Sequence, residues 1–337
     1  MKTTSLFSGS GMLALSLVLV PAFSTGAAAQ ALPDVARGVA IPEDKGYAIE
    51  KLGDGLYFVT DGFYTTMFMT TGKGVIVVDA PPTLGDKMLK AIAETTTEPI
   101  RFVIYSHAHA DHIGSAALYP KDAVYIAQKE TLGRLASVND PTRIVPYGMF
   151  VGGKPVPLPT VMFDKKYDLK VGTQEVELTY HGENHEPGNI YIYAPKQKVL
   201  MVVDIIFPGW TPFKGLAIAE NVPGYIKAHD EILAYDFQTM VTGHWGRTAT
   251  RQDVTTQREY LADIQNNAAT ALKTVGFYGV AKRTGMEDIS LLFETYLNAV
   301  TQSCSDATTA KWKGRLGGVE TWTFGHCYAV VMALRVD

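Results

Sequence analysis

The sequence of 337 residues predicts a mixed chain of helices and strands, of the α/β or α+β class. Short apolar runs bounded by Gly, Pro and Asp indicate strands, and longer runs with apolar residues every three or four positions indicate helices. Several apolar strands end in a polar residue, which places that residue at the rim of a sheet, where α/β sites are built. Hydrophobic residues make up 47% of the chain, so disorder is excluded as its dominant state.

The elements expected before residue 140 begin with strands and then alternate with helices. Asp61-Gly62 is a turn signal, so the strands on either side of it form a hairpin. Pro81-Pro82 ends the third strand, because proline cannot donate to a sheet ladder. The expected strands are residues 55–60, 64–69, 75–79, 100–105 and 124–126, and the expected helices are residues 84–93, a segment after His112 and a segment through Leu132 and Leu135.

The second half of the chain begins with a long loop at residues 139–159, which is rich in Pro and Gly; loops of this length are often functional. Beyond Arg251 the pattern becomes helical, with Tyr260, Leu261 and Ile264 on one face. We expect residues 251–337 to form a mostly helical C-terminal extension that covers the core or forms a subunit contact. Strands are expected near 161 and at 175–180, 190–193, 200–204 and 239–242, with a helix after Val222.

Residues 1–31 have the pattern of a secretory signal peptide. Lys2 precedes an apolar run at 11–23, and small residues follow, so that cleavage after Ala29 or after Ala31 fits equally well. The apolar run is shorter than the roughly 20 residues that a membrane-spanning helix needs. We therefore expect a periplasmic or secreted protein with no stable membrane insertion after cleavage, whose main domain covers residues 32–250.

The two cysteines, Cys304 and Cys327, cannot build a Cys₄ or Cys₂His₂ zinc site, so any metal site must use histidine and carboxylate. In an oxidising compartment these cysteines are expected to form a disulfide, and two buried free thiols are the alternative. The net charge of −4 and the lack of basic runs argue against nucleic acid as a partner. A small molecule is therefore the expected partner.

Three of the eight histidines fall within the six residues His107-Ala108-His109-Ala110-Asp111-His112. Alternation along an extended segment places His107 and His109 on one side. Imidazoles combined with a carboxylate are typical ligands of zinc or a similar metal. More ligand types are present than one tetrahedral zinc needs once distant ligands join, so the motif predicts two metals.

Three further residues are candidate distant ligands. His185 lies in a tight loop between two expected strands, and Asp204 ends an apolar strand. His244 follows Gly243 at the end of another strand. Glycine beside a ligand lets the backbone approach the metal closely.

The motif at 107–112, followed in order by these three residues, resembles the metallo-β-lactamase superfamily over roughly residues 47–246. The resemblance implies an α+β fold, an αββα sandwich, with the C-terminal helical extension outside it. It also implies a dinuclear site between the two sheets, holding two Zn²⁺ or another divalent metal such as Fe, Mn or Co. By this resemblance the first metal is held by His107, His109 and His185, the second by Asp111, His112 and His244, and Asp204 bridges the two.

Two more positions, Asp79 and Glu186, are interpreted through the resemblance. Asp79 ends an early strand and matches an acid that supports the ligands from behind. Glu186 departs from the family pattern, because many members carry Thr or Ser directly after the histidine that His185 matches. The sequence leaves open whether this departure alters the chemistry.

The expected function is that of an exported dinuclear zinc hydrolase acting on a small ester, lactone or thioester. Two metals lower the pKa of a shared water, and Asp111 is the expected catalytic residue that orients the hydroxide and carries its proton. The alternatives are a β-lactam hydrolase, an organophosphate or phosphodiester hydrolase and, outside hydrolysis, an iron-dependent persulfide dioxygenase. A bridging Asp204 favours esters and lactones over β-lactams.

Aromatic residues in three loops are expected to form the substrate pocket, which favours a partly apolar organic substrate. The alternative is that each of them simply packs into the core. The natural substrate, the metal and the oligomeric state stay open, and an oligomer is compatible with the sequence. The pocket residues are Phe63, Tyr64, Phe150, Trp210 and Phe213.

Overall fold

The structure is a computed structural model that describes residues 31–138, 140 and 142–336. Residues 1–30 of the expected signal peptide therefore lie outside the described residues. Within the described ranges, no helix combines the length and the hydropathy needed to cross a bilayer.

The first half of the chain forms a seven-stranded sheet whose strands are neighbours in chain order. Strands β1 to β4 are antiparallel, whereas β4 to β7 are parallel and are joined through helices α1, α2 and α3. The strands are β1 (Ala48–Gly53), β2 (Leu56–Thr60), β3 (Thr65–Met69), β4 (Val75–Val78), β5 (Ile100–Ile104), β6 (Val124–Gln128) and β7 (Val161–Phe163), and the helices are α1 (Asp86–Thr95), α2 (Ala110–Ile113) and α3 (Lys129–Val138).

The second sheet has five strands in the order β12-β11-β10-β9-β8. Only β11 and β12 pair in parallel, and the chain between them passes through helices α4 and α5. The elements are β8 (Lys166–Val171), β9 (Gln174–Thr179), β10 (Tyr191–Ala194), β11 (Val199–Val202), β12 (Thr239–Val241), α4 (Lys214–Ile218) and α5 (Val222–Leu233).

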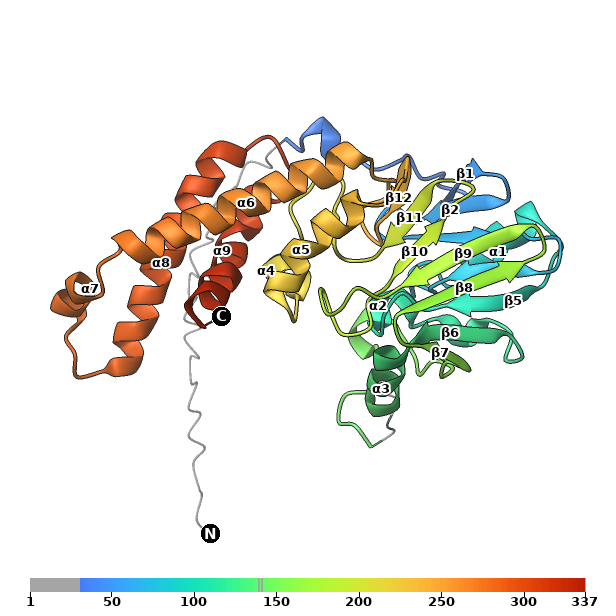
Figure 1. Ribbon diagram of the computed structural model, residues 1–337, viewed down its shortest axis with the longest axis horizontal. Helices are drawn as coiled ribbons and strands as arrows, with labels where there is room; N and C mark the ends of the chain where they lie inside the picture. Colours follow the sequence, from blue (N-terminus) through green and yellow to red (C-terminus); the bar gives the residue numbers. More distant parts are fainter. Residues whose placement is uncertain (1–30, 139, 141, 337) are drawn as a thin grey trace, which may run out of the picture. The chain divides into compact units, whose positions relative to one another are not determined.

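The two sheets pack face to face because their strands alternate apolar side chains between an inner and an outer core. In β4, Ile76 and Val78 face the core between the sheets, while Val75 and Val77 face α1. Strand β11 repeats this alternation toward the helices on the other side. Figure 1 shows the two layers of strands, blue to green and yellow-green to orange. The αββα sandwich that the sequence predicts is confirmed.

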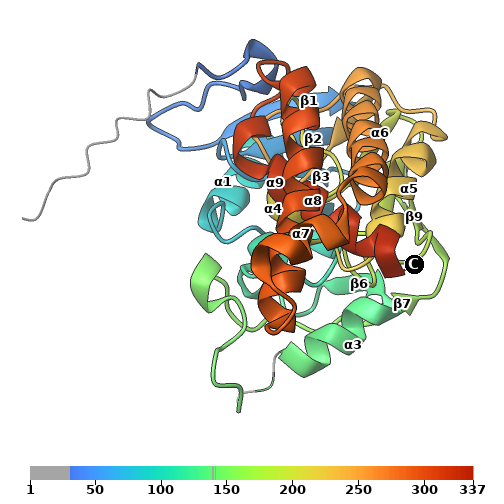
Figure 2. The same ribbon diagram turned by 90° about the vertical axis from the view of Figure 1, so that its left-hand side faces the viewer.

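Four C-terminal helices follow β12: α6 (Arg251–Thr274), α7 (Phe277–Thr284), α8 (Ile289–Trp312) and α9 (Val319–Val336). Helices α6, α8 and α9 share a hydrophobic core with the second sheet, whereas α7 packs against α8. A capping box formed by Thr250 and Asp253 starts α6. Helices α6, α8 and α9 lie side by side, as Figure 2 shows from the side of α7, and a disulfide between Cys304 and Cys327 joins α8 to α9. From Leu32 onward the sandwich and these helices form one compact unit.

Candidate metal centre

The predicted ligands converge at one edge of the sandwich, where strands of both sheets end. Strand β5 leads into His107, and α2 begins directly after His109. In the second sheet, Asp204 follows β11 and His244 follows β12, while His185 lies in the loop between β9 and β10. Backbone hydrogen bonds tie the two sheets together here, since the amide of Thr65 donates to Gly243 and that of Ile190 donates to Ser106. The edge is therefore held by the backbone of both layers.

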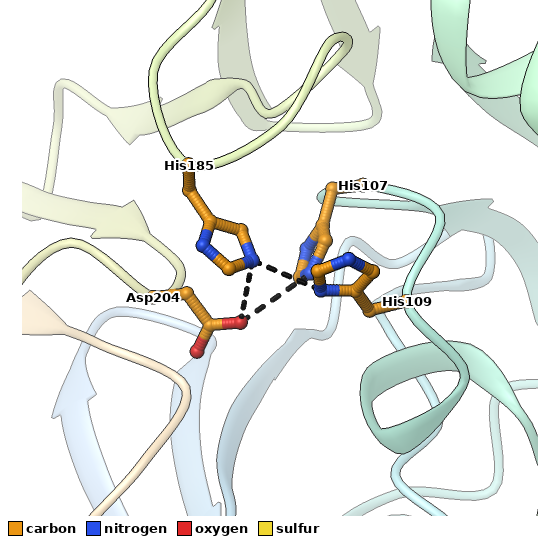
Figure 3. Close-up of side chains that lie close together, drawn as sticks. All are labelled: His107, His109, His185 and Asp204. Atoms are coloured by element: carbon orange, nitrogen blue, oxygen red, sulfur yellow. Dashed lines mark hydrogen bonds and ion pairs between the residues drawn. The ribbon is translucent and has the colours of Figure 1, made fainter. Parts of the chain in front are cut away.

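The first group of ligands consists of three imidazoles and one carboxylate. His185 Nε2 lies 2.9 Å from His109 Nδ1 and 3.2 Å from Asp204 Oδ2. His107 Nε2 lies 3.4 Å from the same carboxylate oxygen. Figure 3 shows the four side chains pointing toward one another. These four residues offer ligand atoms close enough together to hold one metal ion.

The second group adjoins the first through Asp204. His112 Nε2 lies 3.1 Å from His244 Nε2 and 3.5 Å from Asp111 Oδ2. The Asp204 carboxylate reaches this group with both oxygens: Oδ2 lies 3.2 Å from His112 Nε2, and Oδ1 lies 2.9 Å from His244 Nε2. The structure therefore brings together all seven residues that the sequence singles out, with Asp204 between the two groups.

The protonation of the first group favours metal binding. Burial lowers the pKa of His107 well below its ordinary value and the pKa of His109 to about 4, so both imidazoles are neutral at pH 7. Burial alone would raise the pKa of Asp204, yet the imidazoles of His112, His244 and His185 hold it well below its usual range. Neutral imidazoles and an ionised carboxylate are the forms that bind metal.

Negative charge in the second group attracts cations. Burial disfavours the charged form of His112, but Asp204 and Asp111 outweigh burial and raise the pKa of His112 to about 10, so a metal that binds here must displace a proton from this imidazole. In addition, His107 Nε2 and Asp204 Oδ1 are buried and form no well-aligned hydrogen bond among the described residues, although each lies within 3.4 Å of another candidate ligand atom. A buried polar atom without a partner is costly, and a metal ion would satisfy both atoms. The donor set thus fits two divalent cations.

Asp79 supports the cluster from behind, through a neighbouring serine. Its carboxylate accepts a hydrogen bond of 2.7 Å from the Ser106 amide, and Ser106 Oγ lies 2.9 Å from His107 Nδ1. Asp79 and Asp204 both have positive φ angles, 54° and 62°. Such backbone costs roughly 1–3 kcal/mol per residue and is concentrated at functional sites.

Beside the ligands lies a cavity of about 570 Å³ with mostly apolar walls. Four of the predicted pocket residues line it: Phe63, Tyr64, Phe150 and Phe213. The hydroxyl of Tyr64 donates to Asp111 Oδ2 at 3.3 Å. Burial and the Asp111 and Asp204 carboxylates raise the pKa of Tyr64 above its ordinary value. Its hydroxyl therefore stays protonated at neutral pH and acts as a hydrogen-bond donor. Sequence reasoning did not single out several further lining residues, among them Arg143, Val145, Tyr147, Ile218 and Trp245.

The prediction needs correcting at Trp210, which does not line this cavity. Its indole N–H donates to the carbonyl of Ala36 at 2.8 Å, and its ring stacks on Trp245 with centroids 5.0 Å apart. The loop after Asp204 turns Trp210 away from the ligands, and Trp245 forms the cavity wall in its place. Only the folded path of that loop shows which of the two tryptophans faces the cavity.

Three histidines outside the ligand set have structural partners. His181 Nε2 lies 2.9 Å from the Tyr235 hydroxyl, and His229 Nε2 lies 2.8 Å from Gln257 Nε2. His326, in α9, lies with Nδ1 2.9 Å from the Tyr260 hydroxyl and with Nε2 3.1 Å from the carbonyl oxygen of Phe213. The last contact connects a C-terminal helix to the cavity wall.

The family model described as the metallo-beta-lactamase superfamily matches residues 59–259, which is more than half of the chain. The chain belongs to the metallo-β-lactamase superfamily. The match contains all seven predicted ligands. Most members of the superfamily are metal-dependent hydrolases that bind two divalent metals, so the fold and the converging ligands agree with membership.

Among curated proteins, the chain is similar to the 2,4-dinitroanisole O-demethylase subunit alpha of Nocardioides sp. (strain JS1661), at 25% identity over 64% of this chain and 61% of that protein. It is also similar to a metallo-beta-lactamase type 2 of Elizabethkingia meningoseptica, at 29% identity over 51% of this chain and 66% of that protein. The chain thus spans less than two thirds of the length of these relatives.

Among solved structures, a metallo-beta-lactamase from Pontibacter korlensis matches with a TM-score of 0.51 and 17% identity, over 63% of this chain and 97% of that one. The stereoselective inverting sec-alkylsulfatase from Pseudomonas sp. matches with a TM-score of 0.59 and 16% identity, over 85% of this chain and 50% of that one. At these identities the likeness shows a shared fold.

Proposed function

We propose that this protein is an exported, dinuclear zinc hydrolase that acts on a small, largely apolar ester, lactone or thioester. One observation carries the proposal: two groups of ligands share Asp204 and adjoin a cavity with apolar walls. The disulfide between Cys304 and Cys327 supports export to the periplasm or beyond, because disulfides persist in oxidising compartments.

The metal-binding residues, Asp111 and Tyr64 have different roles in the proposed hydrolysis. Two divalent cations bound there would supply a hydroxide nucleophile at neutral pH and polarise the substrate's oxygen. Asp111 is partly exposed, with a quarter of its side chain accessible at the cavity, and can accept the proton of the nucleophile and pass it to the leaving group. Tyr64, which donates to Asp111, keeps that carboxylate oriented.

The apolar cavity wall predicts an effect on substrate affinity. Phe150 is 84% exposed and lines the cavity, so a bound apolar substrate would cover its ring. We expect Phe150→Ala to raise KM about tenfold with little change in kcat, because the lost contact serves ground state and transition state equally. Steady-state kinetics on a hydrophobic ester measure both constants.

Leu158 offers the matched control for this change. It lies in the same loop and is 45% exposed, but it does not line the cavity. Leu158→Ala should leave KM unchanged. Equal KM values for Phe150→Ala and the wild type would contradict an apolar substrate bound against this wall.

A substrate panel tests the proposed reaction. The zinc-loaded protein is incubated with lactones, a thioester, aryl esters, a chromogenic β-lactam, a phosphotriester and 2,4-dinitroanisole, each with and without a chelator. We expect turnover of a lactone or ester that the chelator abolishes. Turnover that survives complete removal of metal would contradict a metal-dependent reaction.

Hydrolysis of β-lactams is the second candidate, because the relative from Elizabethkingia meningoseptica is named a metallo-beta-lactamase. Chelator-sensitive turnover of the β-lactam alone would favour this candidate. Turnover of the phosphotriester would instead indicate an organophosphate hydrolase. Bound iron with oxygen uptake on a persulfide would instead identify a dioxygenase.

A further inference from the structure

Glu186 is a fully buried carboxylate directly beside the metal ligands. It follows His185 in the chain, and its side chain has no exposed surface. Its Oε1 accepts a hydrogen bond of 2.5 Å from the amide of Ala108, between two ligands of the motif. Its Oε2 lies 3.2 Å from His109 Nε2 and 3.3 Å from a guanidinium nitrogen of Arg134, in contacts that lack the alignment of a hydrogen bond. Burying a carboxylate costs free energy unless it is paired with other groups, so these contacts are what hold Glu186 in place.

The ring of His109 lies between the ligand cluster and Glu186. Its Nδ1 lies 2.9 Å from His185 Nε2 and so faces the metal position, whereas its Nε2 faces the carboxylate. A neutral imidazole carries one proton, on one of its two nitrogens. A carboxylate beside Nε2 keeps the proton there, which leaves the lone pair of Nδ1 free for a metal.

Arg134, in α3, supplies the compensating charge. It forms ion pairs with Glu186 and with Glu220. Glu220 is anchored to the same loop, because its amide donates to the carbonyl of His185 at 2.8 Å. His109, Glu186 and Glu220 together could hold a cation, but the guanidinium of Arg134 already pairs with both acids. Arg134 therefore takes the place that a further metal ion would occupy between Glu186 and Glu220.

We propose that Glu186 is a positioning residue for His109. Its carboxylate, 3.2 Å from Nε2, favours the tautomer with the proton on Nε2 and so strengthens Nδ1 as a ligand of the first metal. The guanidinium of Arg134, 3.3 Å from Oε2, offsets part of the cost of burying this carboxylate. The proposal rests on the proposed function, and it gives a role to the residue at which this chain departs from the family pattern.

Glu186→Gln tests the proposal with zinc alone as the probe. Glutamine has the same shape but only one acceptor oxygen, so it cannot accept from both Ala108 and His109. We expect zinc affinity to fall about 10- to 100-fold, as for other partners of ligating histidines, in a competition titration against a chromophoric chelator. In ¹⁵N-histidine NMR of the zinc-loaded protein, the Nε2 proton of His109 should shift or disappear.

Glu220→Gln is the matched control. It removes the other acid paired with Arg134 but leaves the contact between Glu186 and His109, so zinc affinity should stay within about twofold of wild type. The melting temperature of each chelator-treated variant reports whether it folds. If Glu186→Gln does not fold, Glu186→Asp replaces it, because aspartate keeps the buried charge but withdraws it from His109, and zinc affinity should fall again.

The outcomes separate this proposal from the proposed function. Unchanged zinc affinity and an unchanged His109 signal in Glu186→Gln would overturn the positioning role. Equal losses of affinity in Glu186→Gln and Glu220→Gln would also overturn it, because the effect would then belong to the Arg134 pairing. A wild-type protein that binds zinc but hydrolyses nothing in the panel would contradict the proposed function and leave this test valid.

Discussion

His107→Ala is expected to lower kcat/KM at least roughly 10³-fold, a loss of about 4 kcal/mol of transition-state stabilisation. The reason is that His107 Nε2 is one of the four ligand atoms of the first group and is buried beside Asp204. Without it, the first metal keeps two imidazoles and a shared carboxylate. Kinetics on the substrate found in the panel measure the loss, and metal analysis reports the zinc bound per chain.

A second variant and a control distinguish the loss of a metal ligand from misfolding of His107→Ala. Asp111→Asn changes a partly exposed ligand of the second group and should cause a loss of similar size. His181→Ala removes a histidine four residues before His185 whose partner is Tyr235, and it should keep wild-type activity. Wild-type rates in His107→Ala would show that the dinuclear reading is wrong.

Cys304→Ser is expected to lower the free energy of unfolding by about 3 kcal/mol without changing kcat. Cys304 and Cys327 are buried in the core that α6, α8 and α9 share with the second sheet, and their bond closes a loop between positions 23 residues apart. The loss follows from the chain-entropy model, in which the cross-link restricts the unfolded chain. Chemical denaturation followed by circular dichroism measures the difference.

Reduction of the wild type is the control for the disulfide. Denaturation under a strong reductant should bring the wild type close to Cys304→Ser, whereas the variant itself should not respond to the reductant. A wild type that is equally stable with and without reductant would contradict a stabilising disulfide. A fall in kcat for Cys304→Ser would show that the C-terminal helices act on the chemical step.

The convergence of the seven candidate ligands could be predicted because most of its signal is local in sequence. Four of its members lie within residues 107–112, and each of the others follows an apolar strand or lies in a tight loop. The central strands were equally readable, since a run such as Val75–Val78 is buried on both faces. A strand or a closely spaced motif lies within one segment, so the pattern of residues in that segment is enough to predict it.

Edge strands and contacts between distant segments could not be predicted in this way. Strands β1 and β8 were not expected, because each lies at the edge of its sheet and carries charged side chains that mask the strand pattern. The contact of Glu186 with His109 and the exchange of Trp210 for Trp245 depend on how loops fold over one another. No local pattern encodes such contacts, so the structure was needed to find them.

The contact between α9 and the cavity wall bears on how new activities would arise in this protein. His326 lies against the carbonyl oxygen of Phe213, and Trp322 meets the Phe213 ring with centroids 5.5 Å apart. We therefore expect a laboratory selection for altered substrate range to recover substitutions in α9, although none of its residues lines the cavity. Transplanting the ligand loops alone into another sandwich would transfer the catalytic chemistry and leave the selectivity behind.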